Sequence, residues 1–226
     1  MPSPPEPVLR RDVVVGRNSA VWQRLAPRLA ALGCLCVAIG HRDMGAFAFA
    51  AGDRVWVLSY SRRPAENSAL LAMLGQAAVA EIIYVSSSSA VVTDRTACYE
   101  YPRVKQLAER DALALPNGRV LVIGMVYERA EQLPGGATVA TSCNALAAFM
   151  AAPAWPARRR TLFDVVRRPF RNRFEYAAHR WYGWLMARTG AYPCLLRPLD
   201  ALLRALGLRW YGYTYLSNAL WMSTTS

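Results

Sequence analysis

Short apolar runs alternate with helical patterns along the first part of the chain, and this alternation is what most restricts its fold. The runs end at glycine, serine or other polar residues, and they lie at 12–15, 34–39, 55–59, 82–85 and 119–125. Patterns with helical spacing stand between them, around Val21, Leu25 and Leu29, over Asn67–Ala80 and over Tyr99–Ala114. Continuous apolar strands separated by helices are typical of a parallel sheet covered on both faces. We therefore predict an α/β fold with a doubly wound parallel sheet.

The interval between the second and third strands is short. About 15 residues separate the two runs, whereas a single crossover between parallel strands already takes a dozen or more residues. A further helix and strand do not fit in that interval. We therefore predict that the sheet is shortened by one strand.

Positive charge is concentrated in the last third of the chain. Residues 1–150 carry 15 Lys or Arg and 12 Asp or Glu, a net charge of +3, whereas residues 151–226 carry 12 Arg and 3 acidic residues, a net charge of +9. The composition changes within 151–160, at APAWPARRR. We expect three segments: a flexible, proline-rich N-terminus at 1–10, a sheet-containing domain at 11–150, and a basic, aromatic-rich helical extension at 151–226.

Apolar residues recur at helical spacing within the expected extension. From Leu162 to Leu185 they predict a helix with a kink at Pro169, and a second helical pattern covers Pro198–Leu208. A basic, aromatic-flanked amphipathic helix suits an anionic membrane surface, which makes residues 151–226 a candidate membrane contact. The alternative is that the apolar stripe packs on the sheet or on a second copy in a homo-oligomer, with solvated arginines. Nucleic acid is disfavoured because no reading motif accompanies the charge.

Several classes of protein are disfavoured by the sequence. No apolar run reaches the roughly 18–20 residues of a membrane-spanning helix, and the first ten residues contain no signal-peptide core. Five cysteines without paired spacings are typical of reduced thiols in a cytoplasmic protein. Cys34 and Cys36 are expected to be buried in their strand, and no metal site is predicted. We expect a cytoplasmic protein, with a peripheral position on the inner face of the membrane as the alternative.

Lys105 is the only lysine in a chain with 26 arginines. Tyr101 precedes it by four residues, so on a helix the two side chains share a face. Lysine is a compact donor with a pKa that shifts readily, which arginine cannot replace. An adjacent ammonium favours the phenolate, so we expect Lys105 to lower the pKa of Tyr101. The alternative is a surface lysine on an amphipathic helix.

Over roughly residues 12–130 the sequence resembles the short-chain dehydrogenase/reductase superfamily, nearest its extended branch of nucleotide-sugar epimerases and dehydratases. The resemblance rests on VVVGRNSAVW, on ENSALLAMLGQAA before IIYVSSSSAVV, and on YEYPRVKQLAE before RVLVIGMVYE. It implies a Rossmann-like fold and a catalytic set of Ser88, Tyr101 and Lys105, with Ser87 and Ser89 as open alternatives to Ser88. Glu109 matches an acidic residue that is common in the family one turn after the lysine. Asn67 matches an asparagine that often opens the central helix of the family.

The resemblance also implies a nicotinamide cofactor, held by the loop after the first strand and by neighbouring residues. The candidate cofactor-binding residues are Gly16, Arg17, Asn18, Ser19, Arg42, Asn67 and Lys105. Arginines near the tip of the second strand suit a 2′-phosphate, so NADP is preferred to NAD. Asp43 is a late candidate for the acidic residue that NAD enzymes place on the ribose. The loop departs from the three-glycine pattern, with Ser19 at the second position and Trp22 at the third.

Two functions remain open. The first is an NAD(P)-dependent oxidoreductase or epimerase-like enzyme acting on a nucleotide- or lipid-linked sugar or another small hydroxyl or keto substrate. The second is a catalytically silent relative that uses the fold as a binding or assembly module. Lys105 favours the first, and Trp22 favours the second.

Overall fold

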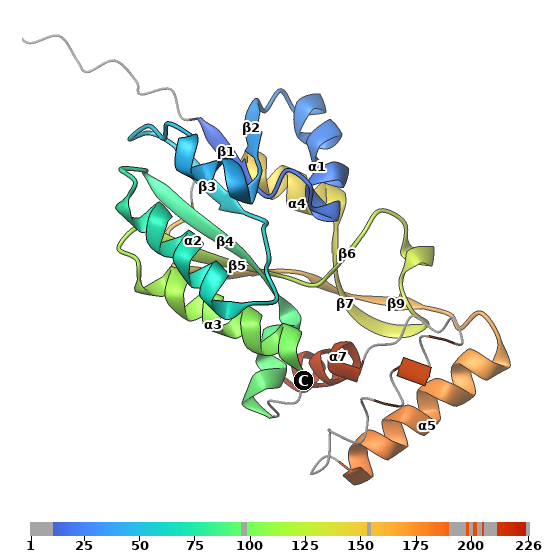
Figure 1. Cartoon of the computed structure of the whole chain (residues 1–226). Helices are drawn as coiled ribbons and strands as arrows, with labels where there is room; N and C mark the ends of the chain where they lie inside the picture. The colour runs from blue at the N-terminus through green and yellow to red at the C-terminus, as the bar shows by residue number, and fades with distance from the viewer. Residues whose placement is uncertain are drawn as a thin grey trace, which may run out of the picture. The chain divides into compact units, whose positions relative to one another are not determined.

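A computed structural model describes residues 11–95, 99–152, 155–189, 198, 201–202, 205 and 212–224 of the chain. The expected flexible N-terminus at 1–10 lies outside the described residues, and so does most of the helical pattern at Pro198–Leu208. Figure 1 shows the helices and strands with their labels. Among the described residues, no helix combines the length and the apolar character needed to cross a bilayer.

The central element is a six-stranded sheet with the order β2-β1-β3-β4-β5-β8. Its strands are β1 (Asp12–Val15), β2 (Cys36–Ile39), β3 (Arg54–Val57), β4 (Glu81–Ser87), β5 (Gly118–Ile123) and β8 (Arg159–Leu162). β1 pairs in parallel with both β2 and β3, and β3 pairs in parallel with β4. The chain therefore winds outward in both directions from β1, which confirms the predicted α/β fold with a doubly wound sheet.

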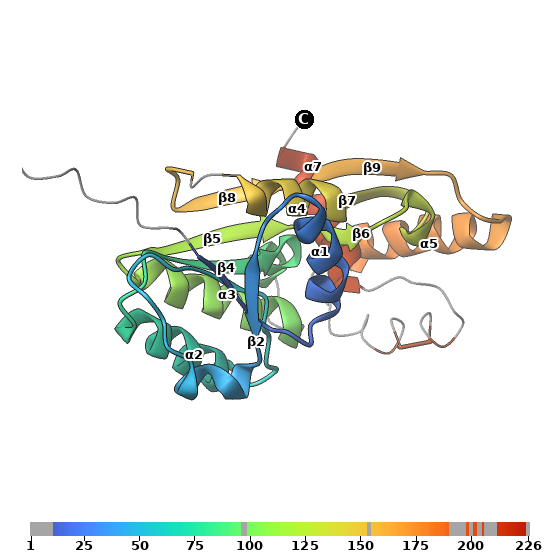
Figure 2. The same ribbon diagram turned by 90° about the horizontal axis from the view of Figure 1, so that it is seen from above.

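Helices cover both faces of this sheet. They are α1 (Ala20–Ala31), α2 (Pro64–Gln76), α3 (Glu100–Ala114) and α4 (Cys143–Ala151). Figures 1 and 2 show α2 and α3 on one side of the sheet and α1 and α4 on the other. The Ser68 hydroxyl of α2 donates to Asp111 in the C-terminal half of α3 at 2.6 Å. On the other side, the ring of Phe149 in α4 lies 6.5 Å from the ring of Trp56 in β3.

The sheet lacks the further edge strand that a full fold of this type has beyond β2, as predicted. Between β2 and β3 the chain forms only a 3-10 helix, η1 (His41–Ala46). The shortening leaves β2 at the edge of the sheet, where Leu35, just before the strand, is 91% exposed. Cys34 and Cys36 are partly exposed, so the prediction that they are buried is wrong. An edge strand without a covering crossover cannot bury its side chains as a central strand does.

The helix predicted from Leu162 to Leu185 is wrong in its first half. Residues 159–162 form β8 of the central sheet, and β9 (Asp164–Arg168) pairs antiparallel with β7 (Gly136–Ser142). β7 also pairs in parallel with β6 (Met125–Tyr127), which completes a three-stranded sheet. The helix α5 (Arg173–Thr189) begins only after Pro169. The last described helix is α7 (Gly212–Thr224).

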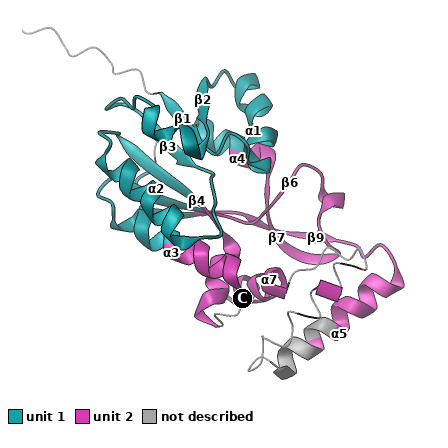
Figure 3. Ribbon diagram, in the orientation of Figure 1, with its two compact units in different colours: residues 1–85, 108–121, 147–160 teal, residues 86–107, 122–146, 161–226 magenta. Residues whose placement is uncertain are grey.

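The chain divides into two compact units, which Figure 3 shows in different colours. Unit 1 contains residues 1–85, 108–121 and 147–160, and unit 2 contains residues 86–107, 122–146 and 161–226. Unit 1 has a buried arginine, Arg54, which donates to the Asp12 carboxylate and to the carbonyls of Met150 and Ala152. These hydrogen bonds satisfy the guanidinium and join β1 and β3 to the end of α4.

Candidate active site

The loop after β1 in unit 1 makes a tight turn that only glycine fits. Gly16 has φ +122°, and a Cβ atom on it would lie 2.9 Å from the Ser59 backbone nitrogen. The backbone amides of Gly16 and Arg17 both donate to the Ile39 carbonyl, at 2.9 and 3.0 Å. The turn is therefore held closely against the ends of β2 and β3. This is the task of the first glycine in a dinucleotide-binding loop.

Ser19, at the second glycine position, starts the helix that follows. Its backbone is extended, and its hydroxyl accepts from the Trp22 backbone amide at 3.1 Å. A serine in this position is a favourable N-cap, and it leaves a helix N-terminus of the kind that binds phosphate groups. The Trp22 side chain is buried together with Leu25 and Leu29. The helix therefore accommodates the tryptophan in the core of unit 1, and the turn at Gly16 forms despite it.

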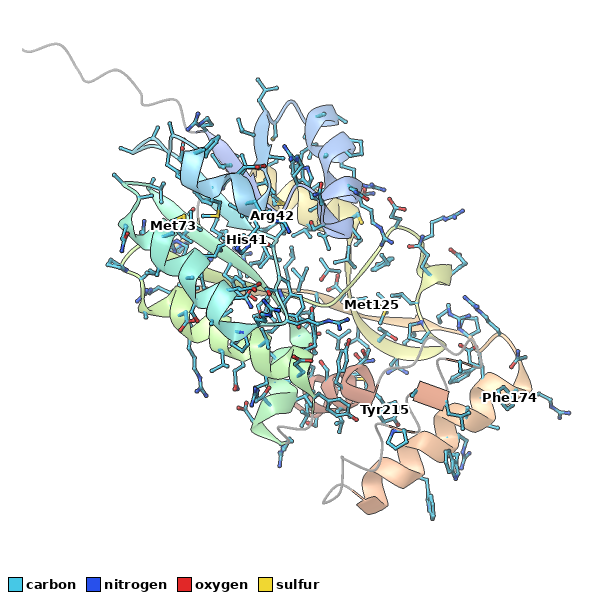
Figure 4. The ribbon with its side chains drawn as sticks, in the orientation of Figure 1. His41, Arg42, Met73, Met125, Phe174 and Tyr215 are labelled. Carbon is cyan, nitrogen blue, oxygen red and sulfur yellow. The ribbon has the colours of Figure 1, made fainter. Side chains whose placement is uncertain are left out.

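The end of β2 carries both a basic and an acidic residue. The Asp43 carboxylate accepts from the Gly40 backbone amide at 3.0 Å and lies 3.3 Å from the Arg17 guanidinium. Arg42 is exposed beside it, as is Asn18 in the loop after β1. Figure 4 labels Arg42 next to His41, at the start of η1. Arg17 thus forms an ion pair with Asp43, and a 2′-phosphate bound here would compete with the Asp43 carboxylate for the Arg17 guanidinium.

Asn67 does not open its helix, because α2 begins three residues earlier at Pro64, a residue suited to a first helical position. The buried Asn67 amide instead accepts from the Ser61 backbone amide at 3.0 Å and donates to the Ser61 carbonyl at 2.8 Å. Asn67 therefore fixes the loop that leads from β3 into α2. Its place in the structure is that of a loop-positioning residue.

In unit 2, Tyr101 lies near the start of α3 and forms a side-chain hydrogen bond with Ser87, the last residue of β4. Burial raises the pKa of Tyr101, and the hydrogen bond with Ser87 lowers it to a smaller extent. The expected net lowering of this pKa is therefore wrong, because the desolvation of the phenol is the larger effect.

Lys105 is 6% exposed, one turn after Tyr101 on the same helix. The alternative of a surface lysine is therefore wrong. In the C-terminal half of α3, which belongs to unit 1, the buried Glu109 carboxylate lies 3.3 Å from the Arg159 guanidinium of β8. The acidic residue predicted one turn after Lys105 thus forms an ion pair within unit 1.

Ser88 is directed to a different partner from Ser87. It begins the 3-10 helix η2 (Ser88–Asp94), and its hydroxyl receives a hydrogen bond of 3.4 Å from Ser217 in α7. The Ser88 carbonyl accepts from the Trp221 indole at 2.9 Å. Ser89 is buried, and its hydroxyl lies 2.9 Å from that of Ser87. Of the three serines, Ser87 is the one that the structure joins to Tyr101.

Helix α7 covers this part of unit 2, and sequence reasoning did not identify it as part of the site. The Tyr213 ring lies 5.5 Å from the Tyr101 ring, measured between centroids, and 5.8 Å from the Tyr99 ring. Together with Ser217 and Trp221, Tyr213 forms a stripe at intervals of four residues. That spacing is the one signal in the sequence that could have revealed a helix face turned toward the site.

Solved structures with this arrangement of strands and helices match most of the chain. TunA, an NAD-dependent NDP-hexosamine 5,6-dehydratase involved in tunicamycin biosynthesis, is 12% identical, with a TM-score of 0.53 over 80% of this chain and 82% of its own. A dTDP-4-dehydrorhamnose reductase of Bacillus anthracis, in complex with NADP, is 7% identical, with a TM-score of 0.53 over 76% of this chain and 81% of its own. MoeE5, in complex with UDP-glucuronic acid and NAD, is 17% identical, with a TM-score of 0.51 over 69% and 78%. The chain therefore shares the Rossmann-like fold of these enzymes. No protein-family model and no curated protein matches the sequence.

Within this Rossmann-like fold, the chain combines a regular turn at Gly16 with two departures. Trp22 replaces the small residue that usually allows the helix to approach the strand, and η1 replaces a helix and a strand. Both departures lie in unit 1, whereas Ser87, Tyr101 and Lys105 lie in unit 2.

Proposed function

We propose that the chain is an NAD(P)-dependent oxidoreductase or epimerase-like enzyme acting on a nucleotide- or lipid-linked sugar or another small hydroxyl or keto substrate. The observation that carries the proposal is the hydrogen bond between Tyr101 and Ser87, with the sole lysine buried one turn further along α3. Lysine is almost never fully buried unless it is paired, so the burial of Lys105 is consistent with a charged partner in this site. The neighbouring folds that act on sugar nucleotides with NAD or NADP support the choice of substrate class.

Unit 1 offers residues that suit a nicotinamide dinucleotide. The left-handed turn at Gly16 brings backbone close to where a pyrophosphate binds in this fold, and the N-terminus of α1 after Ser19 favours its negative charge. Arg17 and Arg42 would hold a 2′-phosphate, whereas Asp43 would accept from the ribose hydroxyls of NAD. We prefer NADP as the cofactor because this position has two arginines and only one carboxylate, which favours a negatively charged 2′-phosphate. When bound, the cofactor supplies the hydride donor or acceptor.

The side chains of unit 2 are suited to moving a proton. Because burial raises the pKa of Tyr101, its phenol is protonated at neutral pH and can donate a proton to a substrate oxygen. The Ser87 hydroxyl orients that phenol through their hydrogen bond. The ammonium of Lys105 favours the phenolate that is left after the transfer. This order of events assigns Tyr101 the role of general acid and favours reduction of a carbonyl group.

The test is a titration of the full chain with NADPH and with NADH, followed by energy transfer from tryptophan to the nicotinamide. Saturable binding, tighter for NADPH, is the expected result. Carbonyl reduction is then measured from nicotinamide absorbance with a panel of 4-keto nucleotide sugars, using Tyr101→Phe as the inactive variant and Tyr176→Phe, at an exposed position on α5, as its control. Cofactor binding without any reduction that depends on Tyr101 would contradict the proposed chemistry.

A catalytically silent binding module is the second candidate, and Trp22 in α1, at the third glycine position of the family pattern, favours it. In that case neither cofactor binds at millimolar concentration. The same titration therefore separates the two functions, because a silent module would show no saturable energy transfer.

We further propose that α5 contacts an anionic membrane surface. Its side chains Phe174, Trp181 and Trp184 are 58%, 49% and 53% exposed, and their spacing places them on one face of the helix. Arg173 and Arg180 are exposed beside this face. The acidic residue of the helix, Glu175, is instead buried and paired with Arg168 at 2.8 Å. Exposed aromatic rings flanked by arginines suit the interface of a bilayer with anionic lipids.

Sedimentation with vesicles tests this contact. Vesicles of phosphatidylglycerol should bind the full chain at low salt and release it as salt rises, whereas phosphatidylcholine vesicles should bind it weakly. Replacing Trp181 and Trp184 together by serine should abolish binding, and Leu35→Ser, at an exposed apolar position of unit 1, should not. Loss of self-association rather than vesicle binding in the double variant would assign the face to a homo-oligomer instead.

A further inference from the structure

A cavity lies in unit 2, on the face of α7 that is turned away from Ser88 and Tyr101. Its volume is about 90 Å³, and it is bounded by β7, α5 and α7. Thr138 of β7, His179 of α5 and Tyr215, Asn218 and Met222 of α7 line it. Figure 4 labels Tyr215 on the side of α7 nearest α5, and the Tyr215 and His179 rings lie 5.4 Å apart in an edge-to-face arrangement. None of the residues that we assign to proton transfer lines this cavity.

The polar groups around this cavity are uncharged at neutral pH. Burial lowers the pKa of His179, against the opposing charge of Glu175, and burial raises the pKa of Tyr215. None of the ten lining residues is a lysine, arginine, aspartate or glutamate. The nearby Glu175 carboxylate is already held by Arg168 and by the backbone amides of Gly135 and Arg171. A phosphate or carboxylate ligand would therefore meet no cation in the cavity, and its desolvation would be uncompensated.

The hydroxyl group of Thr138 is the next feature of the cavity. Its side chain is 1% exposed, and its hydroxyl has no hydrogen-bond partner within the described part of the chain. A buried hydroxyl without a partner is unfavourable, and a ligand that supplies one relieves this. The Asn218 side chain, by contrast, already accepts from the Val139 backbone amide at 3.0 Å, which fixes α7 on β7. Thr138 is thus the polar group of the cavity most in need of a ligand.

We propose that this cavity binds an uncharged aromatic ring that carries one hydrogen-bonding group, directed to Thr138. The cavity, at about 90 Å³, is smaller than the enclosed apolar cavity of about 150 Å³ that holds benzene, so it accepts one ring at most, with part of that ring outside its open side. Ala219 and Met222 supply apolar contact, and the rings of His179 and Tyr215 supply edge and face contacts. The ring is either a free small molecule or the end of a larger ligand that extends into solvent.

The position of the cavity gives such a ligand an effect on the proposed active site. α7 contacts the cavity through Tyr215, Asn218 and Met222, and it contacts Tyr101 and Ser88 through Tyr213, Ser217 and Trp221. The two sets lie on different faces of one helix. A ring that fixes α7 against β7 therefore also fixes the cover over Tyr101.

Binding of phenol to the full chain, followed by calorimetry and by saturation-transfer NMR, tests the proposal. Phenol is expected to saturate at millimolar concentration, and benzoate, which has the same ring but a negative charge, to bind at least about tenfold more weakly. Thr138→Val preserves the volume of the side chain and should weaken phenol binding about 2- to 10-fold, the effect of one hydrogen bond. Ala219→Phe, at the exposed mouth of the cavity, should abolish it, whereas Ala177→Phe, at an exposed position of α5, should not.

Three results would overturn the proposal: no saturable phenol binding, equal binding of phenol and benzoate, or unchanged binding in a folded Ala219→Phe variant. If Ala219→Phe does not fold, the Thr138→Val variant decides in its place. A free ligand and the end of a larger one are distinguished by comparing phenol with a phenyl glycoside of the same ring. Equal affinity for the glycoside shows that the hydroxyl position is open to solvent and can be extended. None of these measurements depends on cofactor binding, so failure here leaves the proposed enzyme function untouched.

Discussion

Replacing Lys105 by arginine keeps the positive charge but should destabilise the protein. Lys105 is 6% exposed in the packed region of α3, and guanidinium is bulkier than ammonium and carries its donors in a fixed planar fork. Overpacking a buried position costs typically about 1–3 kcal/mol in free energy of unfolding. In a chain of 226 residues, each kcal/mol lowers Tm by about 2–4 °C, so the expected decrease is roughly 2–12 °C.

Urea unfolding followed by circular dichroism measures this change as a lower midpoint with an unchanged slope. The matched control is Arg103→Lys, an exposed position on the same helix, which should stay within about 0.5 kcal/mol of the parent. Lys105→Met separates the two contributions of the side chain, because it keeps the length and removes the charge. If Lys105→Arg is as stable as the control and turns over substrate like the parent, both the packing argument and the assigned role of Lys105 are refuted.

Three further predictions concern single residues of the two units. Ser87→Ala should raise the pKa of Tyr101 further, since the hydrogen bond that lowers it is lost, and Ser88→Ala should leave that pKa unchanged; NMR of ¹³C-labelled tyrosine against pH measures both. Gly16→Ala should destabilise unit 1 by about 1–3 kcal/mol in urea and abolish NADPH binding, because its φ of +122° suits glycine alone and the added Cβ meets backbone. The hydrogen bond from Arg11 holds the pKa of Asp53 below its usual 3.8, so its contribution to stability is present above that value and lost as pH falls through the lower folded value. Asp53→Asn should therefore be less stable than the parent at pH 7 and lose less stability on acidification, and equal acid unfolding curves would contradict this.

Local patterns predicted unit 1 well because its elements are specified by nearby residues. The four short strands up to β4 follow from continuous apolar runs, and the missing strand follows from the length of one interval. In unit 2, the place of Lys105 one turn after Tyr101 on a helix follows from the spacing of the two residues, whereas its burial was not predicted. By contrast, the burial of Cys34 and Cys36 was predicted wrongly, because being at the edge of a sheet is a property of the whole strand order.

The errors in unit 2 come from contacts between residues far apart in the sequence. The four-residue spacing of Leu162 and Val166 resembles a helix, but pairing of Val165 and Val166 with Val139 and Thr138 in β7 makes this segment a strand. Alternation along a strand end explains why Ser87, one of the open alternatives, contacts Tyr101 while Ser88 contacts α7, since a shift of one residue turns a side chain to the opposite face. The Ser88 contacts with α7 join residues 129 and 133 positions apart. The four-residue spacing of Tyr213, Ser217 and Trp221 indicates a helix face, but no local pattern indicates that Ser88 is what this face contacts.

Because the chain has a single lysine and that lysine is buried, chemical labelling of Lys105 reports local opening around α3. An amine-reactive reagent that modifies lysine side chains has only Lys105 to modify, and in the closed structure that amine is shielded. The labelling rate of the peptide that contains Lys105, read by mass spectrometry after digestion so that the N-terminal amine is counted separately, therefore measures how often α3 comes loose from its surroundings. A ligand that closes unit 2 should slow this rate, whereas one that acts elsewhere should not. The same shielding means that an enzyme attaching a group to a lysine side chain can reach its one target only while this helix is open.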